Sequence, residues 1–340
     1  MDGASRRSML LGFAGGIALV IGLLWVVEGA RVGVILTHAD PALFGAAVGF
    51  ALFWLVAWGL MLRTVLGAVG VSVSVTTSFL VHVTAVFANN VTPFAQAGGE
   101  PVTALLVSRL SGTRYETSLA GIASVDVLNA VSSLGLMLFG IAVYAGSFTL
   151  GSGLSVAVGS TLAFALLTLV VFLLLWRYRG TLIARVASLV STVIDWFRWG
   201  PLASRSLSET AVADRMRGFF GSVERVAGDR RGIAVALALS TAGWVLQAVA
   251  LVTTFAALGH TLPLAVALFV IPLSNLAGAT PLPGGLGGIE AALVGLLAPT
   301  TGINVAVVTA AVLLFRVTVY WIPIAIGGTS ATAYGVSALS

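Results

Sequence analysis

Long apolar stretches separated by short polar segments run through most of this 340-residue chain. Several of them reach about 18 residues or more, the length of a helix that crosses a bilayer. Their apolar positions do not alternate with polar ones, as they would in a membrane β-barrel. We therefore predict an all-α, polytopic membrane protein with about eight transmembrane helices. The predicted spans are residues 9–28, 42–62, 76–92, 117–143, 154–176, 233–256, 262–280 and 303–327.

Two shorter apolar pieces, residues 99–111 and 287–298, also have a helical pattern. At about 1.5 Å per residue, each of them reaches only about half of a hydrocarbon core that is about 30 Å thick. We therefore predict that both are re-entrant half-helices, which enter and leave the membrane on the same side.

Each half-helix follows a copy of one unusual motif, which runs from Asn89 to Pro101 and again from Asn275 to Glu290. Both copies contain Asn, then Thr-Pro, then a short spacer, then Gly-Gly and Glu. Proline and paired glycine break helices, and a glutamate in hydrocarbon is costly. A membrane protein accommodates such a segment where it is buried in protein or lines a polar cavity. One copy in each half points to the central site of a transporter built from a repeat.

The arginine residues predict the orientation. All 17 basic residues are arginine, and nearly all lie in segments that this topology places on one side, above all 177–232. The positive-inside rule makes that side cytoplasmic, with both termini there, in the cell (inner) membrane. The two halves are then inverted repeats, about 42–143 and about 233–327, within a single integral membrane domain, 1–340.

The segment 177–232 is the one sizeable extramembrane stretch that we predict, and its pattern is amphipathic. A helix is expected to begin at Ser206, with Glu209 completing a capping box. Such basic helices either lie on the anionic inner leaflet or pack against the underside of the bundle, and both interpretations stay open. The predicted apolar stripe is Val212, Met216, Phe219, Phe220, Val223 and Val226.

The composition excludes several classes of protein. A mean hydropathy of +1.08 with 9% charged residues is incompatible with a soluble domain, where charged residues reach about 25%. The chain has no cysteine, and its three histidines lack metal-ligand spacing, so we expect no metal and no cofactor. The net charge of +5 follows from the loop arginines, and we expect no nucleic-acid partner.

Motifs of membrane enzymes are also missing. Gly151-Ser152-Gly153 falls in a predicted external loop without the histidine partner that a rhomboid-type protease needs. No His-Glu-x-x-His sequence is present for a metalloprotease. We therefore expect a protein that is not an enzyme.

Glu100 and Glu290 begin the two half-helices. In one interpretation each offsets the helix dipole, which contributes about 0.3–1 kcal/mol at an exposed end. An ionised residue at mid-membrane costs about 2.5–3.5 kcal/mol, so dipole capping alone does not explain them. A function in binding or translocation is the alternative.

Asp126 and Arg316 lie near the centres of long apolar runs, and each follows its motif glutamate by the same interval, from 100 to 126 and from 290 to 316. They therefore hold equivalent positions in the two repeats. Two interpretations stay open: an ion pair between the repeats, or a site for a substrate headgroup or a proton. Asn129 is one helical turn from Asp126 and shares its face.

The charges of this predicted centre suit a zwitterionic or amino-bearing phospholipid headgroup. Two glutamates, an aspartate and an arginine give a net negative charge, which attracts a cation. The glycine N–H groups at the half-helix ends suit an anion such as a phosphate. The candidate translocation residues are Glu100, Asp126, Glu290, Arg316, Asn129, Gly98, Gly99, Gly287, Gly288, Thr92, Pro93, Thr280 and Pro281.

The Thr-Pro…Gly-Gly-Glu-Pro segment with Asp126, and the later Pro-x-Pro-Gly-Gly-x-Gly-x-x-Glu segment, resemble one known family. It is the flippase-like transmembrane domain of the lysylphosphatidylglycerol synthase/flippase proteins, and the resemblance covers nearly the whole chain. It implies two re-entrant helices and translocation of a lipid headgroup, with Asp126, Arg316 and the motif glutamates as the functional set. The chain lacks the aminoacyl-transferase domain of full-length synthases, which leaves a lysyl-lipid substrate in doubt.

We therefore expect a lipid flippase that moves a phospholipid or polyprenyl-linked headgroup through a polar cavity at the midplane. One alternative is a proton-coupled transporter of a small polar solute. Another is a membrane partner of an envelope or glycosylation enzyme that transports nothing. The expected partners are membrane lipids and such enzymes, while the lipid, the direction and the oligomeric state remain open.

Overall fold

The computed structural model describes residues 3–27, 29–91, 99–147, 177, 209–279 and 282–339, and these residues form helices and connections without any strand. The helices are α1 (Gly3–Val26), α2 (Gly29–Thr37), α3 (Pro41–Ala68), α4 (Val75–Val91), α5 (Gly99–Ser111), α6 (Tyr115–Ser147), α9 (Glu209–Gly228), α10 (Arg230–Ala257), α11 (Leu264–Asn275), α12 (Gly288–Thr301), α13 (Val305–Arg316) and α14 (Ile322–Leu339). Two 3₁₀ turns, η1 (Leu276–Ala279) and η2 (Pro283–Gly285), and a π-helical turn, η3 (Val317–Trp321), complete the order.

Four stretches of helix are long and apolar enough to cross a membrane: Pro41–Ala68, Tyr115–Ala145, Arg230–Ala257 and Val305–Thr332. A bent pair, α1 with α2, has the hydropathy of a fifth span. The prediction of an all-α, polytopic membrane protein is confirmed. The count of eight spans stays a prediction, and the span predicted at 154–176 lies outside the described residues.

The largest departure from the predicted elements follows the first span. Residues 29–37 were expected to be an external loop, yet they form α2, which turns by 90° from α1. The buried side chain of Val32 packs there with Ala306 and Ala310 of α13. Tertiary packing of this kind stabilises a helix that is too short to be stable alone.

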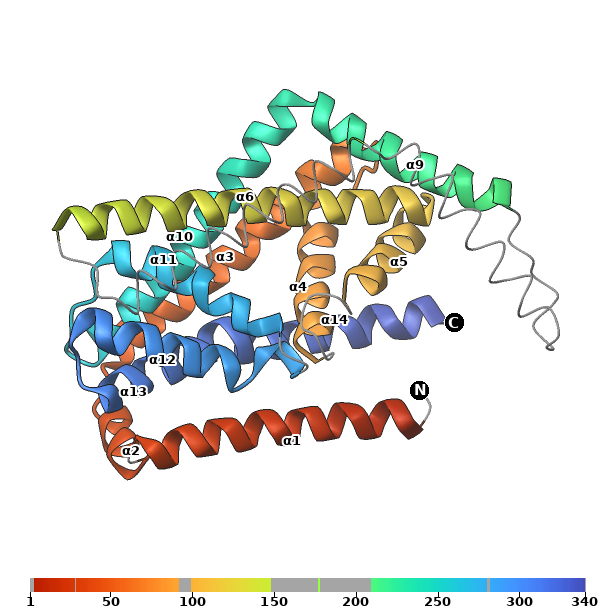
Figure 1. The fold of residues 1–340 in the computed structure, drawn as a ribbon. Helices are drawn as coiled ribbons and strands as arrows, with labels where there is room; N and C mark the ends of the chain where they lie inside the picture. Colours follow the sequence, from red (N-terminus) through yellow and green to blue (C-terminus); the bar gives the residue numbers. More distant parts are fainter. Residues whose placement is uncertain are drawn as a thin grey trace.

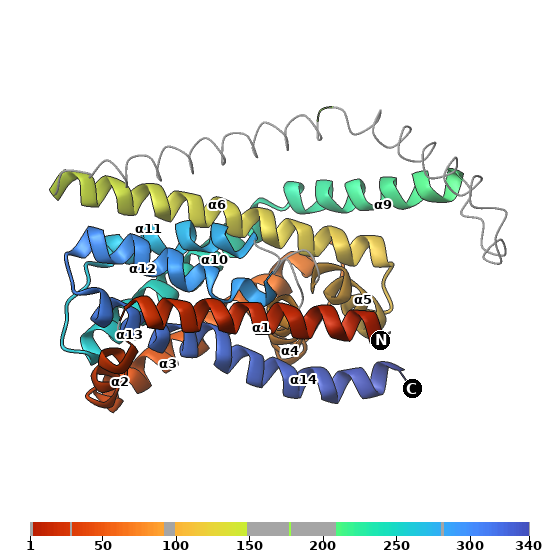
Figure 2. The same ribbon diagram turned by 60° about the horizontal axis from the view of Figure 1, so that its bottom comes forward.

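The helices form one bundle in which sequence-distant segments lie side by side. α3 packs along α10, α6 along α11, and α4 along α14. The side chains of Leu55, Phe255 and Phe269 are fully buried where α3, α10 and α11 meet. Both termini lie at one end of the bundle with α9, whereas α2 and the α12–α13 connection lie at the other end (Figures 1 and 2).

Two short helices stand out within the bundle at the positions of the predicted half-helices. α5 has 13 residues and α12 has 14, so each is only about 20 Å long. α5 packs against α4 and α6, and α12 packs against α11 and α13. Their lengths and their neighbours are those expected of re-entrant half-helices.

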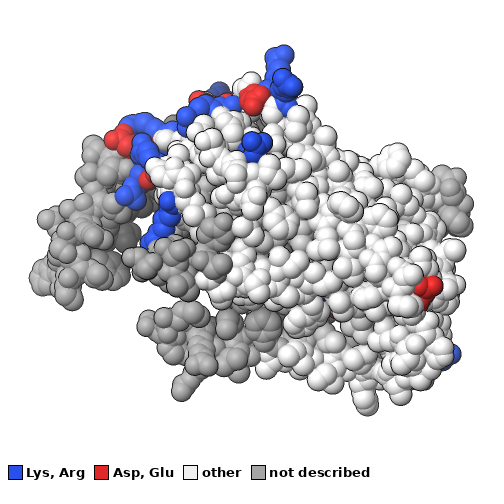
Figure 3. Space-filling view, turned by 180° about the vertical axis from the view of Figure 1, so that it is seen from behind, with Lys and Arg blue, Asp and Glu red and all other residues white. Residues whose placement is uncertain are grey.

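Charged side chains gather at the end where α9 lies, and most of the remaining visible surface is uncharged (Figure 3). Glu116 at the start of α6 pairs with Arg114 at 3.6 Å and with Arg215 of α9 at 3.3 Å. The apolar stripe of α9 is at least partly buried from Met216 to Val226. This helix therefore packs on the bundle, and its predicted start at Ser206 lies outside the described residues.

Candidate functional site

The second motif forms a tight turn that only glycine fits. Gly284 has a φ of +57°, and a Cβ atom there would lie 2.3 Å from the Tyr320 ring. Gly287 has a φ of +84°, again in the left-handed region that side chains disfavour. The chain then enters α12 at Gly288, which places Glu290 in the first turn of the half-helix.

The Glu290 side chain is buried, and each of its two carboxylate oxygens accepts a hydrogen bond. Its Oε1 accepts a hydrogen bond from Arg316 Nε at 2.7 Å, and its Oε2 accepts one from the Gly287 N–H at 2.6 Å. Arg316 also donates from Nη2 to the Gly284 carbonyl at 3.3 Å. The side chains of Arg316 and Glu290 are only 8% and 2% exposed, respectively. The second repeat therefore contains a sealed ion pair.

Tyr320 supports this ion pair and joins the two motif copies. The π-helical turn η3 places its ring under Arg316, with the guanidinium carbon 4.4 Å from the ring centroid. The Tyr320 hydroxyl lies 3.4 Å from the carbonyl oxygens of both Asn90 and Pro283. Asn90 belongs to the first motif and Pro283 to the second, so the two copies meet as the repeat predicted.

The first repeat holds a different pair. The carboxyl groups of Glu100, in the first turn of α5, and Asp126, on α6, lie close enough to interact with each other. Glu100 is half-buried and Asp126 is exposed, so the pair is open on one side.

The two pairs are equivalent in register. Glu290 and Arg316 are 26 positions apart, as are Glu100 and Asp126, and in each repeat the motif glutamate contacts that partner. The interpretation of an ion pair between Asp126 and Arg316 is therefore wrong for the described structure, because the guanidinium pairs inside its own repeat. Tyr320, which sequence reasoning did not single out, is the residue that joins the two motif copies.

Asn129, one helical turn after Asp126 on α6, contacts a neighbouring helix. Its Oδ1 accepts a hydrogen bond from the Ser240 hydroxyl at 2.5 Å. The Ser240 carbonyl in turn accepts one from Trp58 Nε1 at 3.3 Å. This chain of contacts crosses from α6 through α10 to α3.

An aromatic cluster around Trp58 was not predicted. The Trp58 ring centroid lies 5.4 Å from that of Trp54, 5.3 Å from that of Trp244 and 6.1 Å from that of His82. Among the described residues, the buried Trp54 Nε1, Trp244 Nε1 and His82 Nε2 have no hydrogen-bond partner. Tryptophan near the middle of two predicted spans was the available signal, but a lipid-facing or core ring gives the same pattern.

The predicted glycine donors have different surroundings. The Gly287 N–H is used by Glu290, which corrects the expectation that it faces an anion. Gly99 is buried, and a Cβ atom there would lie 1.9 Å from Asn89 Oδ1, so this glycine allows α5 to approach α4. Five candidates lie outside the described residues: Thr92, Pro93, Gly98, Thr280 and Pro281.

The described parts of the chain contain no group of three or more histidine, aspartate or glutamate side chains that is placed to hold a metal ion.

Comparison with known proteins places this arrangement in a family. The family described as the lysylphosphatidylglycerol synthase transmembrane region matches residues 13–327. The chain belongs to this family. It is also similar to two proteins of Methanothermobacter thermautotrophicus, each named a UPF0104 membrane protein. One is 28% identical, over 97% of this chain and 94% of the relative. The other is 23% identical, over 95% of this chain and 94% of the relative.

Membership of the lysylphosphatidylglycerol synthase transmembrane-region family agrees with the resemblance carried by the two motifs. Both similar archaeal proteins are matched over nearly their whole length. The motif segments and both carboxylate-containing pairs fall inside the matched residues.

Proposed function

We propose that the protein is a lipid flippase that carries an amino-bearing headgroup between the leaflets of the cell membrane. The observation that carries this proposal is the accessible carboxyl pair of Glu100 and Asp126. An ionisable residue within a membrane span costs about 2.5–3.5 kcal/mol, which favours a role in the transport path over a purely structural one.

The balance of charge favours a cationic group. Glu290 and Arg316 neutralise each other in their sealed pair. The remaining carboxyl groups are Glu100 and Asp126, and their pair carries negative charge whenever at least one of them is ionised. A protonated amine on a lipid headgroup would be attracted to this charge, and low-dielectric surroundings strengthen such an interaction.

The surface around Asp126 favours a lipid over a small solute. Val127 is 42% exposed and Val131 is 54% exposed on the same helix. In a membrane protein, exposed apolar side chains face lipid, so Asp126 lies beside a surface that acyl chains can contact. A headgroup at the acidic pair with its chains in the bilayer fits this arrangement.

We place the end that carries α9 and both termini in the cytoplasm. Arginine side chains gather at that end, as the positive-inside rule requires of the cytoplasmic face. The acidic pair would then be reached by lipids through the cytoplasmic half of α6, because Asp126 lies nearer to the start of that helix than to its end.

Lipid scrambling in proteoliposomes tests the proposal. Fluorescent phosphatidylethanolamine and phosphatidylglycerol would be loaded separately, and the outer leaflet would be quenched chemically. We expect wild-type protein to move phosphatidylethanolamine faster than empty vesicles do. Asp126→Asn should slow it at least about tenfold, because it removes a charged contact. Asp214→Asn on the surface of α9 is the matched control, since its side chain is 66% exposed.

The same comparison contains the outcomes that contradict the proposal. Equal rates in wild-type, Asp126→Asn and empty vesicles would exclude scrambling of the lipids used. A function as a non-transporting partner of an envelope enzyme would then be favoured.

A proton-coupled transporter of a small solute is the second candidate. The closeness of Glu100 and Asp126 favours it, because two neighbouring carboxyl groups can bind and release a proton. A proton flux that appears when a polar solute is added, and that is lost in Asp126→Asn, would support this candidate over the flippase.

A further inference from the structure

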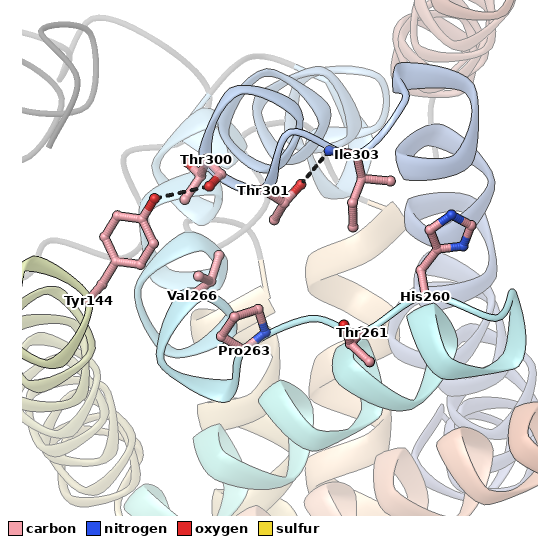
Figure 4. A pocket seen from close by; sticks show the side chains of 8 residues that line it. All are labelled: Tyr144, His260, Thr261, Pro263, Val266, Thr300, Thr301 and Ile303. Atoms are coloured by element: carbon pink, nitrogen blue, oxygen red, sulfur yellow. Dashed lines mark hydrogen bonds between the residues drawn. The ribbon is translucent and has the colours of Figure 1, made fainter. Parts of the chain in front are cut away.

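A cavity of about 310 Å³ lies at the end of the bundle opposite the termini, away from the acidic pair. The cavity is lined by the end of α6 and by residues at the α10–α11 and α12–α13 turns (Figure 4). All of its lining residues are uncharged apart from the titratable His260 and Tyr144. None of its lining residues belongs to the acidic pair or to the ion pair of Glu290 and Arg316.

Three hydroxyl groups around the cavity donate hydrogen bonds to backbone carbonyl oxygens. Tyr144 donates to the Thr300 carbonyl at 3.0 Å. Thr300 donates to the Leu296 carbonyl at 2.6 Å, and Thr301 donates to the Leu297 carbonyl at 2.7 Å. The Thr300 hydroxyl oxygen keeps a lone pair for a further partner, whereas the Thr301 hydroxyl oxygen already accepts from the Ile303 N–H at 3.2 Å.

His260 adds another acceptor. Its Nδ1 lies 2.8 Å from the Leu258 carbonyl oxygen. A carbonyl oxygen only accepts, so Nδ1 must carry the hydrogen of that bond. In the neutral ring Nε2 is then an acceptor, and His260 is one of the residues that line the cavity (Figure 4).

The C-terminal end of helix α12 places partial negative charge beside the cavity. α12 ends at Thr301, and Gly302 caps it in the left-handed conformation with a φ of +68°. The C-terminal end of a helix carries partial negative charge and favours cations. Pro263 and Val266 supply apolar wall. Acceptors, a negative helix end and a short apolar wall together match a protonated amine on a short carbon arm.

We infer that this cavity binds the protonated amine of a lipid headgroup at the extracytoplasmic face. The source of the amine rests on the proposed function, whereas recognition of the amine rests on the cavity alone. Tyr144 lies 18 positions after Asp126 on α6, which is five helical turns, or about 27 Å. The cavity and the acidic pair therefore lie on the same face of one helix.

Binding to the purified protein in detergent tests the inference without any transport. Ethanolamine and glycerol are matched in size, but only ethanolamine carries a charged amine. We expect calorimetry to show binding of ethanolamine and at least about tenfold weaker binding of glycerol. Equal affinity for the two, or no binding of ethanolamine, would overturn the inference.

Two substitutions locate the binding. His260→Ala should weaken ethanolamine binding at least about tenfold, and Thr300→Val should weaken it less. His38→Ala is the matched control, because His38 Nδ1 also bonds a carbonyl, that of Val34 at 2.9 Å, but does not line the cavity. An equal effect of His260→Ala and His38→Ala would overturn the assignment to this cavity.

A further arm separates the two possible sources of the amine. Glycerophosphoethanolamine should compete with ethanolamine if the cavity receives a lipid headgroup, and failure to compete would overturn the lipid source. Amine binding that persists in a protein unable to scramble lipid would contradict the proposed function and leave the amine site standing. Scrambling without amine binding would contradict only the amine site.

Discussion

The two copies of the Gly-Gly-Glu motif share a register but differ in what their glutamates contact. In the second repeat, Glu290 binds Arg316 at 2.7 Å, and both side chains are buried. In the first repeat, Glu100 meets another acid, Asp126, and that acid is exposed. One scaffold thus carries a neutral, sealed pair in one half and an acidic, reachable pair in the other.

The difference separates two roles that the sequence had grouped together. A buried, paired charge whose partners are all satisfied holds the turn, the half-helix and the following span in place. A carboxyl pair that keeps an open side can exchange a proton or bind a cation. We therefore propose a structural role for Glu290 and Arg316, and a role in transport for Glu100 and Asp126.

Removing the arginine should have the largest effect. Arg316→Gln leaves Glu290 buried without its partner, which should lower the free energy of unfolding by about 3–5 kcal/mol. Denaturation in detergent, followed by tryptophan fluorescence, would measure it. The double variant Glu290→Gln with Arg316→Gln removes both charges and should recover much of that loss. A double variant no more stable than Arg316→Gln would contradict the ion pair.

Converting the first repeat into a copy of the second would break the comparison directly. In Asp126→Arg, the guanidinium should pair with Glu100 and remove the negative charge of the acidic pair. We expect lipid scrambling to fall at least about tenfold while the protein remains folded. Full scrambling by a folded Asp126→Arg variant would show that the acidic pair is not the working site.

The glycines of the two motifs should also respond differently. Gly284→Ala combines a left-handed φ with a clash against the Tyr320 ring, so it should cost about 1–3 kcal/mol of unfolding free energy. Gly99→Ala should cost less, because its closest neighbour is the movable side-chain end of Asn89. Thermal melts of the two variants would rank them, and the reverse order would contradict the sealed second turn.

The smallest effect is expected at the Tyr320 hydroxyl, which joins the two motif copies. Tyr320→Phe removes hydroxyl interactions with Asn90 and Pro283 at 3.4 Å but keeps the ring beside Arg316. We expect a loss of about 0.5–1.5 kcal/mol in the free energy of unfolding. A loss as large as that of Arg316→Gln would mean that the hydroxyl, rather than the ion pair, holds the turn together.

Much of the fold could be predicted from the sequence, because apolar length and the two motifs set most of the helix boundaries. The short helix at 99–111 agrees with its prediction residue for residue. The helix α2 could not be predicted in this way, since it depends on packing against α13. The π-helical turn at 317–321 was missed as well, although Pro323, which lacks an N–H donor, lies just beyond it.

The candidate site could be predicted in composition but not in its pairing. The four ionisable groups were found from charge within apolar runs, and the equal spacing in both halves was visible. Which side chains meet depends on how the turn at Gly284 and the first turn of α12 aim Glu290 toward Arg316. The orphaned ring nitrogens near Trp58 depend on contacts among three helices, which no local pattern encodes.

The most direct test of the central claim is chemical labelling of carboxyl groups in the unmodified protein. Dicyclohexylcarbodiimide modifies protonated carboxyl groups in apolar surroundings, and mass spectrometry of the digested protein locates the adducts. The account predicts modification at Glu100 or Asp126 and none at Glu290. Modification of Glu290, or of neither Glu100 nor Asp126, would contradict it.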